Sequence, residues 1–274
     1  MTDFRPSRFE ILPLIIKNLL IINTLAYFAK VTFEGANGGW VTDTFALHNI
    51  RSSLFKPHQL ITYQFMHGSF GHLFFNMFAL WMFGSTLENY WGPKKFITFY
   101  LLCGIGAGLA HLGVLYFETA NLFNELAAFK LNPTLDTFLG LYHRHNLQDF
   151  DQITQVLNAW KNNPNSYELS RQSVEYFSQY TDISLSTPTV GASGAVFGIL
   201  TAFGYTFPNS LIYFYFFFPM KAKWFVIIYA GIELFSGISN SAGDNVAHFA
   251  HLGGAVVGFV LVYIWNKTDR KNFY

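Results

Sequence analysis

Six long apolar runs are the feature that most constrains how this chain can fold. Only 12% of its residues are charged, roughly half the share found in soluble domains. Each run is long enough to cross about 30 Å of hydrocarbon as a helix. The sequence therefore predicts an all-α, multi-pass integral membrane protein with a six-transmembrane-helix bundle, whose helices cover about residues 12–32, 69–90, 95–117, 189–207, 222–238 and 246–265.

Lysine and arginine near the ends of these runs predict the orientation, because cytoplasmic loops carry an excess of both residues. With six spans, all of the following fall on one side: Arg5, Arg8, Lys94, Lys95, Lys221, Lys223, Lys267, Arg270 and Lys271. That side is expected to be cytoplasmic, with both termini inside. The expected location is a bacterial inner (plasma) membrane, with an organellar membrane as the alternative. The apolar stretch LIYFYFFFPM, residues 211–220, is expected to be an interfacial loop.

The segment 118–186 is too long for an ordinary connection. It carries 8 acidic and 4 basic residues, and apolar residues recur within it at helical spacing. We expect an extracytoplasmic helical insertion there, between the third and fourth membrane helices. Residues 1–117 and 187–274 then form one membrane domain. A formal net charge of +1 gives no argument for binding nucleic acid.

Three polar residues lie at a common depth in this topology. Asn76, Ser193 and His251 each precede the cytoplasmic end of their helix by 16 residues, or about 24 Å. His72 lies one turn above Asn76 on the same helical face. Polar groups inside a membrane helix are costly, so they indicate function. The sequence predicts that these side chains meet below the outer surface.

Small residues predict how two of these helices approach each other. Gly194 and Gly198 form one small-residue face, and Gly254 and Gly258 form another on the stripe of His251. Such faces allow close backbone contact in membranes. Packing through these glycines would bring His251 to Ser193.

A serine beside a histidine has the chemistry of an activated nucleophile. The hydroxyl is weak until an adjacent base takes its proton, and a neutral imidazole can do so and later protonate a leaving group. The Ser193 backbone N–H, His72 and Asn76 are the donors expected to stabilise a developing oxyanion. This chemistry requires no metal and no organic cofactor.

The chain resembles the rhomboid family of intramembrane serine proteases. The resemblance rests on HGSFGHLFFN (67–76), GASG (191–194) and AHLGGAVVG (250–258), in that order on three predicted helices. It implies a six-helix core, a Ser–His dyad without an acid, and endopeptidase cleavage of transmembrane protein substrates near their extracytoplasmic end, within the lipid bilayer. It also implies that His72 and Asn76 stabilise the oxyanion.

Other residues of these motifs are expected to support the site. Gly191 leaves room for the substrate backbone, and Phe197 offers a ring for stacking beside His251 although the family often has tyrosine there. His67 is expected to tether the loop before the second helix, and His248 to form a structural hydrogen bond. Asp244 is expected to cap the sixth helix rather than complete a triad. Residues 237–245 are the expected lid.

The same residues allow three alternative functions or sites. A metal site formed by the histidines is disfavoured because no cysteine or carboxylate is expected at their depth. A channel or transporter is disfavoured because the run AVFGILTAFGYTF below Ser193 offers almost no polar path. A catalytically silent rhomboid-like protein that binds membrane clients remains the alternative function. The sequence predicts no oligomeric state.

Overall fold

The computed structural model describes residues 9–34, 39–214, 218–239 and 247–271. The expected cap at Asp244, most of the expected lid, and Arg5 and Arg8 lie outside these ranges. The chain divides into two compact units. One contains residues 1–47, 56–113 and 188–274, and the other contains residues 48–55 and 114–187.

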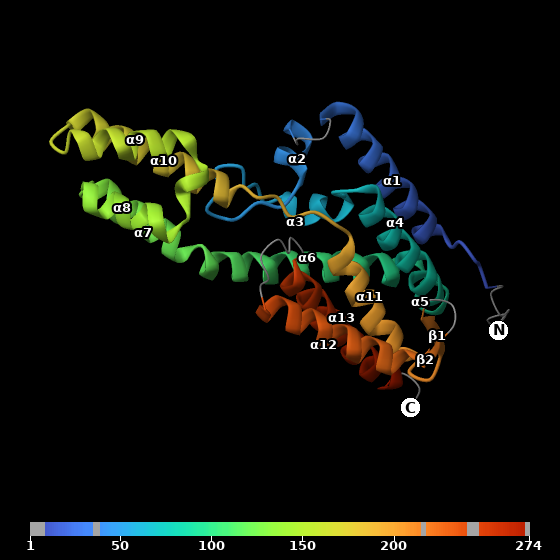
Figure 1. The fold of residues 1–274 in the computed structure, drawn as a ribbon. Helices are drawn as coiled ribbons and strands as arrows, with labels where there is room; N and C mark the ends of the chain where they lie inside the picture. The colour runs from blue at the N-terminus through green and yellow to red at the C-terminus, as the bar shows by residue number, and fades with distance from the viewer. Residues whose placement is uncertain (1–8, 35–38, 215–217, 240–246, 272–274) are drawn as a thin grey trace, which may run out of the picture. The chain divides into compact units, whose positions relative to one another are not determined.

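The first unit is mostly helical (Figure 1). Its elements, in chain order, are α1 (Leu14–Glu34), α2 (Trp40–Phe45), α3 (Gln59–Thr62), η1 (Tyr63–Phe65), α4 (Phe70–Ala79), η2 (Leu80–Gly84), α5 (Ser85–Trp91), the greater part of α6 (Pro93–Glu118), α11 (Ser193–Thr206), β1 (Leu211–Phe214), β2 (Phe218–Lys221), α12 (Ala222–Ser239) and α13 (His248–Lys271).

Four of the described helices are long and apolar enough to cross a membrane: α1, α6, α12 and α13. The second predicted span is one helical run from residue 70 to residue 91, interrupted by the π-helical turn η2. The fourth is shorter than predicted, because α11 has 14 residues and begins at Ser193 instead of residue 189. Fourteen residues rise about 21 Å, less than a bilayer core.

The chain is not purely α-helical as predicted. Residues 211–214 and 218–221 form an antiparallel hairpin in which Leu211 pairs with Lys221. The interfacial loop expected there is therefore a two-stranded structure in its described part. β-branched and aromatic residues favour strands, and this segment is rich in phenylalanine and tyrosine.

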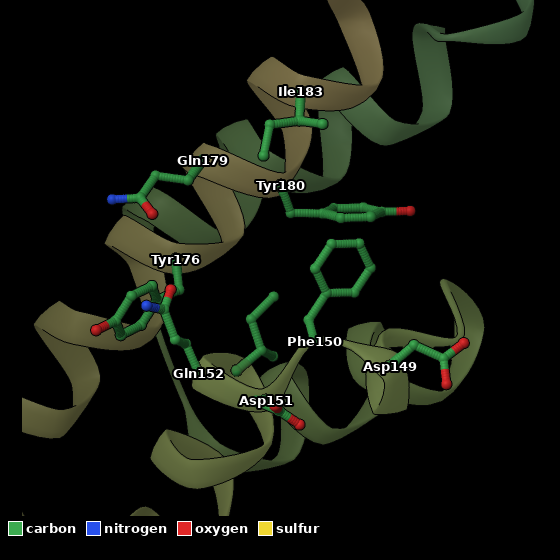
Figure 2. Close-up of a pocket in the computed structure, with 9 residues that line it drawn as sticks. Asp149, Phe150, Asp151, Gln152, Tyr176, Gln179, Tyr180 and Ile183 are labelled. Atoms are coloured by element: carbon green, nitrogen blue, oxygen red, sulfur yellow. The ribbon is translucent and has the colours of Figure 1, made fainter. Parts of the chain in front are cut away.

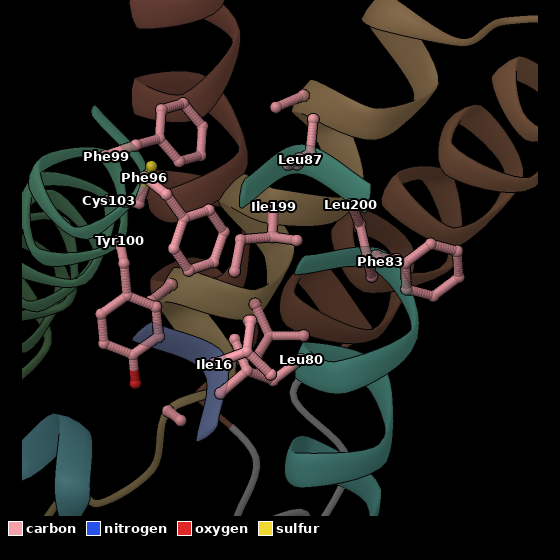
Figure 3. Close-up of a cluster of buried hydrophobic side chains, with 14 of the residues drawn as sticks. Ile16, Leu80, Phe83, Leu87, Phe96, Phe99, Tyr100, Cys103, Ile199 and Leu200 are labelled. Atoms are coloured by element: carbon pink, nitrogen blue, oxygen red, sulfur yellow. The ribbon is translucent and has the colours of Figure 1, made fainter. Parts of the chain in front are cut away.

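α11 lies at the centre of the core (Figure 3). Nine of its 14 residues are buried, and Ile199 and Leu200 pack with Leu80 and Phe83 of η2 and with Phe96 of α6. By contrast, α12 exposes large apolar side chains such as Ile227, Ile228 and Phe235. An apolar outer surface around a packed core is typical of a multi-pass membrane protein.

One buried carboxylate joins two helices in this core. Glu88 of α5 is 3% exposed, and its two oxygens accept the backbone N–H groups of Ile15 and Ile16, each at 2.9 Å. These N–H groups belong to the first turn of α1, which has no acceptors within its own helix. Glu88 therefore fixes the start of α1 to α5.

The second unit contains four helices and a short 3₁₀ turn. These are α7 (Ala120–Leu131), α8 (Leu135–Arg144), η3 (Leu147–Asp149), α9 (Asp151–Asn162) and α10 (Tyr167–Leu185). They enclose a separate core around Phe129, Phe138, Trp160 and Phe177. The helical insertion predicted for residues 118–186 falls within this unit, which also includes residues 48–55 and the last turns of α6.

A shallow pocket lies between α9 and α10 of this unit (Figure 2). Phe150 and Tyr180 meet edge to face at its wall, with ring centroids 5.2 Å apart. In the same unit, Glu125 accepts hydrogen bonds from Arg144 and His145. Partial burial disfavours the charged carboxylate, but these bonds outweigh it and hold the pKa of Glu125 below its ordinary value. The carboxylate is therefore ionised at neutral pH and links α7 to the end of α8.

Candidate active site

Ser193 is the first residue of α11, and the chain reaches it through a turn that glycine makes possible. Leu47 and Thr189 form an isolated β-bridge, and Gly191 donates its N–H to the Tyr63 carbonyl at 3.0 Å. Gly191 has a φ of 134°, a conformation that side chains disfavour. At this turn the extended segment that contains Thr189 ends, and α11 begins at Ser193. The N–H groups of the first helical turn then have no acceptor in their own helix.

Ser193 and His251 are in hydrogen-bonding contact. The distance between Ser193 Oγ and His251 Nε2 is 2.8 Å, and His251 is 9% exposed. The two residues are 58 positions apart in the sequence and lie on α11 and α13. This is the geometry of a hydroxyl beside an imidazole base.

The four glycines do bring α11 and α13 together. A Cβ added at Gly254 would lie 1.9 Å from the Gly194 carbonyl oxygen, and one at Gly258 would lie 2.7 Å from Gly198 Cα. α11 is also close to α6, since a Cβ added at Gly194 would lie 2.4 Å from Ala107 Cβ. The helix that carries Ser193 therefore packs closely against two neighbours through small residues.

A Gly254→Ala substitution tests this packing. Because the added methyl group would clash with backbone rather than with a mobile side chain, the helices must separate, and we expect a loss of about 3 kcal/mol of unfolding free energy. Gly113→Ala is the matched control, because nothing lies within 4 Å of its added Cβ. Equal thermal stability of the two variants in detergent would contradict the close packing.

Phe197 stacks on the imidazole of His251. Their ring centroids are 4.3 Å apart and their planes differ by 10°. Tyr229 of α12 packs on the Phe197 ring, with centroids 4.8 Å apart. The stacking expected from the sequence is thus present, and it fixes the plane of the imidazole without fixing which nitrogen faces Ser193.

His72 and Asn76 lie on α4, with the imidazole of His72 beside Gly191. A Cβ added at Gly191 would lie 2.8 Å from His72 Cε1, 2.9 Å from His72 Nε2 and 3.3 Å from Ser193 Oγ. Asn76 is buried and donates its Nδ2 to the His72 carbonyl at 3.0 Å. The helix itself is capped by Ser69, whose Oγ accepts the His72 N–H.

His67 and His248 differ in their surroundings. The His67 ring is fully buried 5.2 Å from the His72 ring, and neither of its nitrogens has a hydrogen-bond partner among the described residues. Its backbone carbonyl accepts from Lys30 Nζ at 3.4 Å, so the link from this loop to α1 involves the main chain rather than the imidazole. His248 Nδ1 lies 2.7 Å from Glu233 Oε2, in agreement with the expected structural hydrogen bond.

Glu233 is the residue of this site that the sequence reasoning missed. Its Oε2 lies 2.9 Å from His251 Nδ1, on the side of the ring opposite Ser193. The expectation that no carboxylate lies at the depth of the histidines is therefore wrong. A single carboxylate in the apolar run WFVIIYAGIELFSG was the available signal, because an ionisable residue inside a membrane helix indicates function.

Glu233, His248 and His251 also meet a geometric requirement for holding a metal ion. One ligand atom from each lies within 4.8 Å of the others. These groups also bond one another directly, because the Nδ1 atoms of His248 and His251 both lie within hydrogen-bond distance of Glu233 Oε2. The arrangement is complete as a hydrogen-bonded cluster without an ion.

Comparison with known proteins identifies the class of this chain. Residues 55–123 and 169–268, together more than half of it, match the Rhomboid domain. The chain therefore belongs to the rhomboid family.

Two curated relatives are similar at low identity. RHOMBOID-like protein 12, mitochondrial, of Arabidopsis thaliana is 24% identical over 228 residues, which cover 83% of this chain and 51% of that protein. Rhomboid protein 1, mitochondrial, of Saccharomyces cerevisiae is 23% identical over 212 residues, which cover 76% of this chain and 41% of that protein. The chain thus spans about half the length of these relatives or less.

Proposed function

We propose that this chain is an intramembrane serine endopeptidase that cleaves transmembrane proteins near their extracytoplasmic end. The observation that carries the proposal is the 2.8 Å contact between Ser193 Oγ and His251 Nε2, between two apolar helices of a rhomboid-family chain. Because Ser193 is the first residue of α11, it has no preceding helical turn whose carbonyl its hydroxyl could bond. Thr201, further along the same helix, does form such a bond, with its Oγ1 donating to the Phe197 carbonyl at 2.9 Å.

The proposed reaction follows from these positions. His251 Nε2 takes the proton from Ser193 Oγ as the oxygen attacks a peptide carbonyl of a locally unwound substrate. The oxyanion is stabilised by the Ser193 N–H and by donors from His72 and Asn76. The Asn76 amide has two N–H groups and uses one for the His72 carbonyl, so the second is available. His251 then protonates the leaving amine, and water hydrolyses the acyl-enzyme.

The membrane topology is part of the proposal. We place six spans at α1, the run 70–91, α6, α11, α12 and α13, with both termini cytoplasmic and the helical insertion outside. The lipid bilayer and transmembrane substrates are the partners. The named relatives are mitochondrial, so the expectation of a bacterial inner membrane has no support from them and is not part of the proposal.

Covalent labelling separates a protease from a catalytically silent rhomboid-like binder. A fluorophosphonate reacts with a serine only when a neighbouring base activates the hydroxyl. We expect the reconstituted protein to be labelled, with the adduct mapped to Ser193 by mass spectrometry. A protein that binds transmembrane clients but shows no adduct at Ser193 would favour the silent binder.

A further inference from the structure

Glu233 is oriented differently from the rest of its helix. Among the described residues of α12, only Ala222 and Glu233 are buried, while most of the helix presents apolar side chains outward. A carboxylate inside a membrane is costly unless it is paired. Glu233 is 5% exposed and turns toward α13. Glu233 must therefore be stabilised in this position by the side chains that it contacts.

The partners form a chain that ends at the nucleophile. Oε2 of Glu233 lies 2.9 Å from His251 Nδ1, and Nε2 of the same ring lies 2.8 Å from Ser193 Oγ. A carboxylate can only accept a hydrogen bond, so His251 Nδ1 must carry a proton. In the neutral ring this leaves Nε2 as the acceptor that faces the hydroxyl.

The hydrogen bond supplies what ring stacking cannot. Phe197 fixes the plane of the imidazole, but a ring turned by 180° would lie in nearly the same plane. Only a group that binds one particular nitrogen distinguishes the two orientations. His248 holds the same carboxylate oxygen from a second direction, at 2.7 Å, and so limits where Glu233 can point.

We propose that Glu233 is a positioning residue that completes a Ser193–His251–Glu233 triad. The proposal rests on the serine protease function proposed above and departs from the acid-free dyad that the family resemblance implies. Glu233 selects the His251 tautomer that can accept the serine proton, and it stabilises the imidazolium that forms during attack. It touches neither the substrate nor the serine.

Two substitutions test the triad in proteoliposomes with a labelled transmembrane substrate. Glu233→Leu removes the acceptor with a side chain that membrane helices accept, and Glu233→Gln keeps an acceptor but removes its charge. We expect kcat to fall by about 10⁴-fold in both variants, with KM unchanged, because the acid acts on the chemical step. The rate of fluorophosphonate labelling at Ser193 should fall in parallel.

Glu88→Gln is the matched control, because Glu88 is also a buried carboxylate but bonds only the start of α1. It should lower the melting temperature while each folded molecule keeps its kcat. Wild-type kcat in both Glu233 variants would overturn the triad. So would loss of wild-type activity on chelation with recovery on adding Zn²⁺, which would make Glu233 a metal ligand.

Failure of the proposed function has a different signature. If Ser193→Ala cleaves the substrate as fast as the wild type, the serine mechanism is wrong and the triad is overturned with it. If Ser193→Ala is inactive and the Glu233 variants are fully active, only the triad is overturned. The serine variant is therefore measured in the same series.

Discussion

A His251→Ala variant is expected to lose about 10⁴-fold or more in kcat toward a transmembrane substrate. In serine proteases the base and the nucleophile act as a unit, and removing either leaves only the rate that binding and oxyanion stabilisation provide. His251 is the only residue seen bonding Ser193 Oγ through a ring nitrogen in the described part of the chain. Cleavage by the purified variant in proteoliposomes measures the loss.

Covalent labelling provides the second readout for the same variant. Fluorophosphonate labelling of Ser193 should also become slow, because the hydroxyl is then no longer activated. A melting temperature close to that of the wild type shows that the variant is folded. Rapid labelling of a folded His251→Ala protein would contradict the role of His251 as the base.

A Gly191→Ala variant is expected to lower kcat by roughly 10²–10³-fold, the cost of losing one oxyanion donor. The added Cβ would lie 2.8 Å from His72 Cε1 and 3.3 Å from Ser193 Oγ, in the space between the two side chains. The φ of 134° adds backbone strain. His72 must move away from the position where the oxyanion is expected, so KM should change less than kcat. Steady-state kinetics on the reconstituted protein separate the two parameters.

Gly71→Ala is the control for this variant. Gly71 belongs to the same motif as His72, and nothing lies within 4 Å of its added Cβ. Alanine in a helix is favoured over glycine by up to about 1 kcal/mol, so this variant should be fully active and slightly more stable. Activity of Gly191→Ala equal to that of Gly71→Ala would show that the space beside Ser193 plays no part in catalysis.

The Ser193–His251 contact could be predicted from sequence because two periodic signals agreed. The glycine pairs at i and i+4 marked the faces that touch, and the equal distances to the helix ends placed the two polar residues at one depth. Both signals depend only on the regular rise of a helix. Both signals therefore hold even when the predicted helix ends are wrong by a few residues. The start of α11 at Ser193 was less predictable, because it depends on the unusual φ of Gly191 and on bonds to Tyr63 and Leu47 from distant parts of the chain.

Glu233 was missed for a different reason. The depth argument applies to helices that run from outside to inside, and in the predicted topology the fifth span runs the other way. The contacts of Glu233 with His248 and His251 depend on the rotation of α12 against α13, which the sequence pattern of a mostly apolar helix does not specify.

Cleavage of a transmembrane substrate by the wild type and by Ser193→Ala, side by side in proteoliposomes, shows whether Ser193 is the nucleophile of a protease. The substitution removes one oxygen at a position where Gly191 and Gly194 already leave space, so the fold should be preserved. We expect the wild type to release a fragment cut near the extracytoplasmic end of the substrate helix and the variant to release none. Fragment release by Ser193→Ala at the wild-type rate would contradict this role of Ser193.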